Sequence, residues 1–281
     1  MAQNISSSGH SEAPGLCIGT CGYSYGEWVD AGFYPPGTHS AGMLDSYAQR
    51  FSAVELNYTW YQMPAAGAME RMCQKLPEHF RIAAKLTRTL THEIKKDLWT
   101  KQALLFRQGI EPLARQGCLL AILVQLPPSF TRTIPHRSYL AALLDELSGL
   151  PLAVEFRHDS WAVDSVFSEL ARRNVALACV DCPEIPGLFP RLARVTSPDL
   201  FYLRFHGRNA RGWNSGSMQQ QFNYHYSHTE LARWADIIRT QLLPHARQGA
   251  LFFNNHVRGQ APANALHLAE LLGHPVISSK N

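Results

Sequence analysis

Short apolar segments that end in a polar residue recur eight times along the chain. They are Leu16–Gly19, Ala53–Asn57, Arg81–Lys85, Ala121–Gln125, Leu152–Arg157, Ala176–Asp181, Phe201–His206 and Ala250–Asn255. Their short length and their lack of helical periodicity are typical of buried parallel strands. The pattern therefore predicts eight such strands.

Between these segments, apolar residues recur with the spacing of an amphipathic helix. One stripe consists of Trp99, Ala103, Phe106, Ile110 and Leu113, and others run through 44–51, 231–242 and 261–272. Eight alternations of strand and helix predict a (β/α)8 TIM barrel of the α/β class. An open doubly wound sheet usually has fewer strands and a glycine-rich phosphate motif after the first strand, and the sequence contains no such motif.

The sixth crossover, Cys182–Leu200, is the weakest unit of this pattern. Four prolines in this segment leave little room for a long helix, because proline lacks an amide hydrogen and clashes with the preceding turn. We expect this crossover to be short or irregular, which gives a distorted or seven-helix barrel as the alternative architecture.

Two connections are unusually long, Thr20–Ser40 and Gly207–Ser227. Both follow predicted strands, so both are expected at the carboxyl end of the barrel, where loops that control access to a substrate are built. One of them is a candidate lid.

Composition agrees with an ordinary globular protein, since 46% of the 281 residues are hydrophobic and 17% are charged. No segment approaches the roughly 20 apolar residues needed to cross a bilayer. Met1–Ala13 lacks the basic start and apolar centre of a secretory signal and is expected to be a disordered lead-in. We expect residues 14–281 to form one barrel domain in the cytoplasm.

Cysteine usage and charge narrow the picture further. The six cysteines lie mostly within apolar runs and lack a zinc or iron–sulfur spacing, which favours buried reduced thiols. The net charge of +4 is mild, and no run of Lys and Arg exceeds two residues. Nucleic-acid binding is therefore not favoured, since it usually requires a basic stripe.

Polar residues at the ends of the predicted strands can be assigned to one face, because side chains alternate along a strand. Counting in twos places Glu55 with Asn57, Glu155 with Arg157, and Arg204 with His206. The same count places Lys85 with Ala83, Gln125 with Leu123, and Asp181 with Cys179. Six strands are thus expected to direct polar groups into the barrel near its carboxyl end, where the active sites of such barrels lie.

A structural explanation also exists for these groups. Glu155 with Arg157, or Glu55 with Lys85, are candidates for buried ion pairs, and His206 or His158 for core histidines. Buried pairs gain little net stability after desolvation, so a ring of acids and bases open to water favours function. Of Asn254 and Asn255, one is expected to point into the barrel and the other to cap or turn the chain.

A divalent metal is a further hypothesis. The candidate ligands are Glu55, Glu155, Asp181 and His206, an oxygen-rich set with one imidazole that suits Mg²⁺ or Mn²⁺. Lys85, Arg157 and Arg204 in the same mouth are the alternative means of neutralising the acids.

Several motifs resemble those of a known family. They are Ile18-Gly-Thr-Cys-Gly-Tyr-Ser-Tyr, Val54-Glu-Leu-Asn-Tyr-Thr-Trp-Tyr, Gln125-Leu-Pro-Pro-Ser-Phe, Glu155-Phe-Arg-His-Asp-Ser-Trp, Leu203-Arg-Phe-His-Gly-Arg and Phe253-Asn-Asn. Together they resemble the YecE-like family, known as domain of unknown function seventy-two, from about Cys17 to Leu272. The resemblance implies a TIM barrel and names no substrate. Cys21 is a departure, because many relatives have a small polar residue such as serine there.

Our main functional hypothesis is an enzyme that uses acid–base or metal-assisted chemistry on a small polar or anionic substrate. Glu155 and Asp181 would act as base or metal ligands and His206 as proton shuttle, while Lys85, Arg157 and Arg204 would form an electrostatic cradle. The candidate catalytic residues are Glu55, Lys85, Glu155, Asp181 and His206. The candidate substrate-binding residues are Asn57, Tyr58, His92, Gln125, Arg157, His158, Arg204, Asn254 and Asn255. Hydrolase, lyase and isomerase classes all remain open.

Two alternatives belong to other classes. One is a metal-dependent nucleic-acid-processing barrel, in which the basic loop 204–211 and the aromatic residues Trp213, Phe222 and Tyr224 grip a strand. The other is a non-catalytic ligand-binding barrel, since a fold by itself implies no activity.

Overall fold

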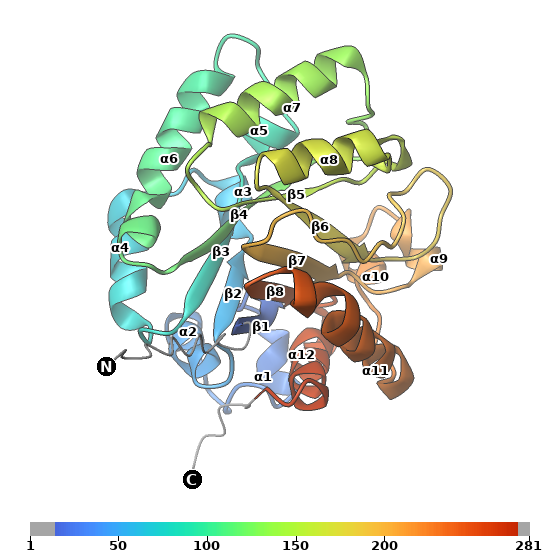
Figure 1. Cartoon of the computed structure of the whole chain (residues 1–281). Helices are drawn as coiled ribbons and strands as arrows, with labels where there is room; N and C mark the ends of the chain where they lie inside the picture. Colours follow the sequence, from blue (N-terminus) through green and yellow to red (C-terminus); the bar gives the residue numbers. More distant parts are fainter. Residues whose placement is uncertain (1–14, 275–281) are drawn as a thin grey trace, which may run out of the picture.

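Eight parallel strands close into a barrel in the computed structural model, which describes residues 15–274 (Figure 1). They are β1 (Gly15–Cys21), β2 (Ala53–Leu56), β3 (Arg81–Lys85), β4 (Leu119–Gln125), β5 (Leu152–Glu155), β6 (Ala176–Asp181), β7 (Leu200–Phe205) and β8 (Gln248–Phe253). Each strand pairs in parallel with the next along the chain, and β8 pairs with β1. The eight predicted strands are confirmed, with differences of one or two residues at some ends.

Seven helices form the outer layer. They are α2 (Ser40–Ala48), α4 (Ala66–Lys75), α6 (Trp99–Arg115), α7 (Ile134–Glu146), α8 (Asp164–Arg172), α11 (His228–Ile237) and α12 (Gln260–Leu271). Figure 1 shows them wrapped around the strands. The predicted apolar stripes lie on α2, α6, α11 and α12, and these side chains pack against the strands as one core. The (β/α)8 architecture is thus confirmed.

Shorter helices lie in the connections. They are α1 (Glu27–Asp30), α3 (Tyr58–Tyr61), α5 (Arg88–Thr91), α9 (Ala210–Trp213), α10 (Met218–Gln221) and the single turns η1 (Asp159–Trp161), η3 (Leu243–His245) and η4 (Val257–Gly259). A π-helical segment, η2 (Ile238–Leu242), continues α11. The two longest connections, after β1 and β7, carry α1 and the pair α9 and α10.

No helix lies between β6 and β7 in the described part of the chain, so the expected irregular sixth crossover is confirmed. Thr196 fastens this segment to the outside of β6, since its hydroxyl donates to the Val175 carbonyl (2.7 Å) and accepts from the Leu177 amide (2.7 Å). Neighbouring β5 and β6 pair through only two residue pairs, Ala153 with Ala176 and Val154 with Leu177.

Small side chains mark the inside of the barrel. Alanine recurs at the inward positions of six strands, namely Ala53, Ala83, Ala121, Ala153, Ala176, Ala178 and Ala250. The larger Leu123, Tyr202 and Phe252 fill the remaining space. The interior is therefore a packed core below the carboxyl ends of the strands, and the polar groups lie above it.

Within residues 15–274, the helices are too short or too polar to cross a membrane. The expected lead-in, Met1–Ala13, lies outside the described residues.

Gly19 on β1 is expected to tolerate no side chain. A Cβ at this position would lie 2.0 Å from the Ala53 carbonyl oxygen and 2.7 Å from the Tyr47 hydroxyl oxygen, both of which hold β1, β2 and α2 together. Gly19→Ala should lower the free energy of unfolding by roughly 1–3 kcal/mol or more, measured by urea denaturation.

Gly42 is the matched control. It lies within α2, and a Cβ there would meet no atom within 4 Å. Gly42→Ala should therefore raise stability by up to about 1 kcal/mol, because alanine is the better helix former. Equal stability of Gly19→Ala and wild type would contradict the tight contact between β1 and β2.

Candidate functional site

The carboxyl ends of the strands open into a cavity of about 800 Å³. Polar side chains from six strand ends line it, namely Asn57, Lys85, Gln125, Arg157, Arg204 and Asn254. Aromatic side chains from the connecting loops form its walls, namely Tyr25, Trp60, Tyr61, Trp213 and Phe222. The cavity lies where the strand-end pattern predicts an active site.

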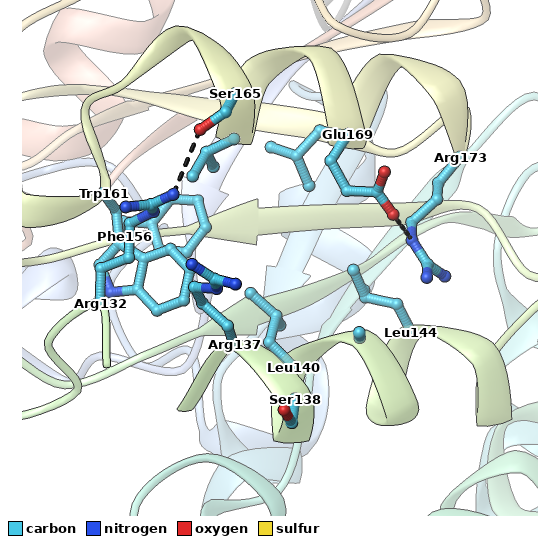
Figure 2. Close-up of a pocket in the computed structure, with 13 residues that line it drawn as sticks. Arg132, Arg137, Ser138, Leu140, Leu144, Phe156, Trp161, Ser165, Glu169 and Arg173 are labelled. Atoms are coloured by element: carbon cyan, nitrogen blue, oxygen red, sulfur yellow. Dashed lines mark hydrogen bonds and ion pairs between the residues drawn. The ribbon is translucent and has the colours of Figure 1, made fainter. Parts of the chain in front are cut away.

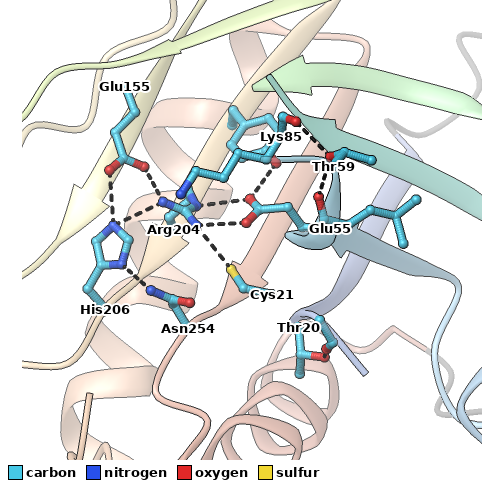
Figure 3. Close-up of polar contacts among 12 residues, drawn as sticks. Thr20, Cys21, Glu55, Thr59, Lys85, Glu155, Arg204, His206 and Asn254 are labelled. Atoms are coloured by element: carbon cyan, nitrogen blue, oxygen red, sulfur yellow. Dashed lines mark hydrogen bonds and ion pairs between the residues drawn. The ribbon is translucent and has the colours of Figure 1, made fainter. Parts of the chain in front are cut away.

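Arg204 lies at the floor of this cavity between two buried carboxylates (Figure 3). Its Nε and Nη2 donate to the two Glu55 oxygens at 2.9 and 2.7 Å, and its Nη1 donates to Glu155 Oε2 at 2.5 Å. The Tyr202 hydroxyl also donates to Glu55 Oε2, at 2.7 Å. One guanidinium thus joins β2, β5 and β7 across the barrel, with the geometry of charge-assisted, partly bidentate pairing.

Glu155 is shared between this floor and the cavity wall. Its second oxygen pairs with Nε of Arg157, whose side chain is 13% exposed and lines the cavity. Burial alone would raise the pKa of Glu155, but Arg157 and Arg204 hold that pKa well below its usual range. Glu155 is therefore ionised, and each of its two oxygens accepts a hydrogen bond from a guanidinium.

His206 is buried beneath the cavity with both ring nitrogens in contact with polar groups. Its Nδ1 lies 3.0 Å from the Asn254 amide nitrogen, and its Nε2 lies 3.2 Å from Arg157 Nη2. Burial and the Arg157 charge lower the pKa of His206 to about 3. The imidazole is accordingly neutral at pH 7, and its position suits holding Arg157 and Asn254 rather than direct contact with a substrate.

Lys85 and His92 form another part of the cavity wall, together with Trp60. The Lys85 ammonium lies 5.2 Å from the centre of the Trp60 ring. Burial, followed by repulsion from Arg204, lowers the pKa of Lys85 to about 8. His92 Nδ1 accepts a hydrogen bond from Trp60 Nε1 (3.3 Å). Desolvation and the charges of Lys85 and Arg157 lower the pKa of His92, so its imidazole is neutral at pH 7.

The charges of the site do not cancel. Lys85, Arg157 and Arg204 supply three cations, whereas Glu55 and Glu155 supply two carboxylates, both of them buried. The cations reach the cavity and the acids lie underneath. The cavity therefore presents a positive surface to whatever enters it.

Asp181 lies outside the cavity, which corrects its predicted position. It is fully buried on the outer face of β6, where its carboxylate accepts hydrogen bonds from Arg208 (2.8 and 2.6 Å), Tyr226 (3.0 Å) and Trp234. The strand-end pattern predicts that Asp181 faces inward with Cys179, but Ala176 and Ala178 face inward, so Asp181 faces outward. The small inward residues were the signal that gives the correct phase of this strand.

The candidate metal-ligand set is not assembled. Both Glu55 and Glu155 are paired with Arg204, and Asp181 lies on the other side of the sheet. Within residues 15–274, no group of three or more His, Cys, Asp and Glu side chains has an arrangement that would hold a metal ion. The residues present do not fit the oxygen-rich site that the sequence suggested.

Three other predicted binding residues lie away from the cavity. The Tyr58 hydroxyl contacts Met69 Sδ (3.8 Å), and His158 Nδ1 contacts Ser160 Oγ (3.0 Å). Asn255 donates to Asn264 Oδ1 (2.9 Å) and to the Tyr224 carbonyl (2.8 Å). As expected for this pair of asparagines, Asn254 points into the barrel while Asn255 ties down the chain.

Trp60, Tyr61 and His256 also line the cavity but are not among the residues that the strand-end pattern predicts. They follow β2 and β8, beyond the last residues that alternation can place. Both long connections contribute walls, Tyr25 from the first and Trp213 and Phe222 from the second. The aromatic residues in these connections were the available signal.

A second hollow, of about 570 Å³, lies between α7 and α8 on the outside of the barrel (Figure 2). Its floor is apolar, with Leu140, Leu144 and Leu170. Glu169, its only acidic lining residue, is paired with Arg173 at 2.6 Å. It lacks the free proton-transfer groups of the mouth cavity, so we place the candidate site at the mouth.

Removal of the Arg204 guanidinium should strongly destabilise the fold. Arg204→Met leaves Glu55 and Glu155 buried and facing each other, so the free energy of unfolding should fall by about 3–5 kcal/mol in chemical denaturation. Adding Glu55→Gln and Glu155→Gln to that variant should restore part of the loss, because no unpaired buried carboxylate remains. Arg247→Met, at an 86% exposed side chain, is the control and should change stability by less than about 0.5 kcal/mol. A loss of that small size for Arg204→Met would contradict the pairing.

Asp181 is expected to hold the loop over the cavity. Arg208, which it binds, also pairs with Glu230 (3.0 Å), and the chain between them carries Trp213 and Phe222. Asp181→Asn should speed hydrogen–deuterium exchange of residues 208–226 measured by mass spectrometry, because the charge-assisted bonds weaken. Asp236→Asn, at a 78% exposed side chain of α11, should leave that exchange unchanged.

Comparisons with known proteins agree with this fold. Residues 17–280 match the family described as Protein of unknown function DUF72. UPF0759 protein YunF of Bacillus subtilis is 28% identical over 253 residues, which cover 85% of this chain and 89% of that protein.

Crystal structures of two similar proteins match nearly their whole length. A DUF72 family protein of Thermotoga maritima is 32% identical, with a TM-score of 0.83 over 92% of this chain and 99% of that chain. A DUF72 family protein of Enterococcus faecalis is 25% identical, with a TM-score of 0.83 over 95% of this chain and 99% of that chain. The resemblance drawn from the strand-end motifs is confirmed, and the chain belongs to the DUF72 family.

Proposed function

We propose that the protein is an enzyme that performs acid–base chemistry on a small anionic molecule bound in the mouth cavity. The observation that carries this proposal is the placement of charge: Lys85, Arg157 and Arg204 line the cavity, while the carboxylates that neutralise two of them lie beneath it. A volume of about 800 Å³ suits a small molecule.

Arg157 supplies the anion-binding donors, and Arg204, whose own donors bind Glu55 and Glu155, adds positive charge beneath them. Each keeps its place through Glu155, so their guanidinium planes are fixed before a substrate arrives. Fixed donors aimed at one position stabilise negative charge without reorganisation during the reaction. A carboxylate or a phosphate suits such donors.

Lys85 and His92 supply the groups that exchange protons. Both line the cavity, and at pH 7 to 8 Lys85 is divided between ammonium and amine while His92 is neutral. A group whose pKa lies near the working pH is effective as both acid and base. Trp60, Trp213 and Phe222 add apolar walls that limit the access of water.

The nucleic-acid alternative is less well supported. Arg208, in the basic loop on which it depends, is tied to Asp181 and Glu230. Trp213 and Phe222 lie near His206, with ring centres 6.2 and 6.1 Å from the imidazole, and line the cavity. These side chains are committed to the mouth rather than displayed along an open groove.

The first test is anion binding. Calorimetric titration with lactate and glycerol 3-phosphate, beside neutral glycerol, should show binding of at least one anion and none of glycerol. Arg157→Gln should weaken anion binding by at least about tenfold, since a charge-assisted contact of about 1.5 kcal/mol or more is lost. Equal binding by wild type and Arg157→Gln would contradict the anion site.

The second test is proton exchange. The protein is incubated in D₂O with a panel of small carboxylates and phosphate esters. It should introduce deuterium into at least one of these compounds, as detected by mass spectrometry. The rate should rise with pH up to about 8, because Lys85 loses its proton there and gains a basic lone pair. Lys85→Met should lower the rate by about 100-fold or more. Lys101→Met, at an exposed position of α6, should leave it unchanged.

A further inference from the structure

Lys85 is the one cation of the mouth without a carboxylate partner among the described residues. Arg204 holds both Glu55 and Glu155, Arg157 holds Glu155, and both acids are thereby satisfied. The Lys85 ammonium instead rests over the face of Trp60 at 5.2 Å and lines the open cavity. Neutralising the buried acids does not require it, so its position calls for another explanation.

The surroundings of Lys85 favour a free amine. Burial and two guanidinium groups lower its pKa to about 8, against an ordinary value of 10.5. About a tenth of the side chain is then unprotonated at pH 7, far more than for a surface lysine. A desolvated lysine beside other cations is the usual form of a lysine that reacts with carbonyl carbon.

We propose that Lys85 is a nucleophile that forms an imine with a small aldehyde or ketone carrying a carboxylate or phosphate group. This inference rests on the proposed function, because Arg157, with the charge of Arg204 beneath it, would hold the anionic group while the carbonyl carbon meets the Lys85 nitrogen. It narrows the substrate from a small anion to an anionic carbonyl compound.

The step balances without an oxidant or reductant. The ammonium releases one proton to solvent, and the nitrogen lone pair then forms a C–N bond to the carbonyl carbon. One nitrogen proton moves to the former carbonyl oxygen, a second proton comes from solvent, and this oxygen leaves as water when the C=N bond forms. The sum is ammonium plus carbonyl giving a protonated imine plus water, so the positive charge at this position is retained.

His92 is placed to relay these protons. Its Nδ1 is engaged by Trp60 Nε1 (3.3 Å) and Thr91 Oγ1 (2.9 Å), which fixes the orientation of the ring at the cavity wall. It lines the same cavity as Lys85 and is close enough for the lysine charge to lower its pKa. A neutral imidazole beside the amine can pass a proton to the departing oxygen.

Reductive trapping tests the inference on the full-length protein. Glyoxylate (a carboxylate) and glycolaldehyde phosphate (a phosphate) are each incubated with the protein and sodium cyanoborohydride, beside uncharged glycolaldehyde, and modified lysines are located by peptide mass spectrometry. At pH 7, Lys85 should be labelled at least about tenfold faster than the exposed Lys95 and Lys101 by one or both anionic probes. Glyoxylate or glycolaldehyde phosphate reacting alone would identify which anion the site takes.

Two variants sharpen the result. Arg157→Gln should slow labelling of Lys85 by the anionic probes about tenfold more than it slows labelling by glycolaldehyde, because only the anionic probes lose a binding contact while the effect of Arg157 on the pKa of Lys85 is common to all probes. Lys85→Arg keeps the positive charge but not the amine, so it should abolish the fast labelling while the protein still binds lactate or glycerol 3-phosphate.

The outcomes separate the two proposals. If these saturated anions bind with dependence on Arg157, but Lys85 is labelled no faster than Lys101, the imine proposal is overturned and the anion site stands. If Lys85 reacts equally fast with charged and uncharged probes in both wild type and Arg157→Gln, the assignment of an anionic carbonyl substrate is overturned.

Discussion

The contact on which the rest of the site depends is the guanidinium of Arg204 held between Glu55 and Glu155. It joins three strands that are distant in the chain, at a depth where water does not screen the charges. A buried triad of this kind contributes little to net stability compared with apolar packing, but the loss of one member is severe. Its value to the molecule is therefore positional: it fixes the floor from which the cavity is built.

The pairing of Arg204 with the two carboxylates also determines the surroundings of the side chains above it. Arg204 binds both Glu55 and Glu155, and the remaining Glu155 oxygen orients Arg157. Lys85 is left facing the cavity, with its ammonium over the Trp60 ring. Burial lowers the pKa of both His206 and Lys85, and repulsion from the neighbouring guanidinium groups lowers these pKa values further. The electrostatic character of the cavity thus follows from the way in which Arg204 neutralises the two carboxylates beneath it.

Much of this arrangement was readable from the sequence, because a strand has only two faces. Alternation correctly placed Glu55, Lys85, Glu155, Arg157, Arg204 and His206 toward the barrel axis. Alternation placed Asp181 on the wrong face of β6. Both faces of this strand are apolar before Asp181, so only the small alanines Ala176 and Ala178 indicate which face is inward. Of the two candidate ion pairs, Glu155 with Arg157 forms, whereas Glu55 pairs with Arg204 and not with Lys85. Alternation cannot decide between these partners, because the choice depends on side-chain reach across the barrel. The positions of Trp60 and Trp213 at the cavity could not be predicted either, because residues in connecting loops follow no regular alternation.

The short pairing of β5 with β6 gives the barrel a preferred place to yield. Only two residue pairs join these strands, and the crossover that follows β6 covers its outer face with irregular chain instead of a helix. Separating strands there requires the loss of fewer backbone hydrogen bonds than at the longer pairing of β7 with β8. The barrel is therefore not equally rigid all round. Its weak point lies between β5, which carries Glu155, and β6, whose Asp181 binds Arg208 of the loop over the cavity. A local separation of β5 and β6 would displace Glu155 beneath the cavity and Asp181, which holds the covering loop, at the same time. The bottom of the cavity and the loop over it are therefore expected to move together.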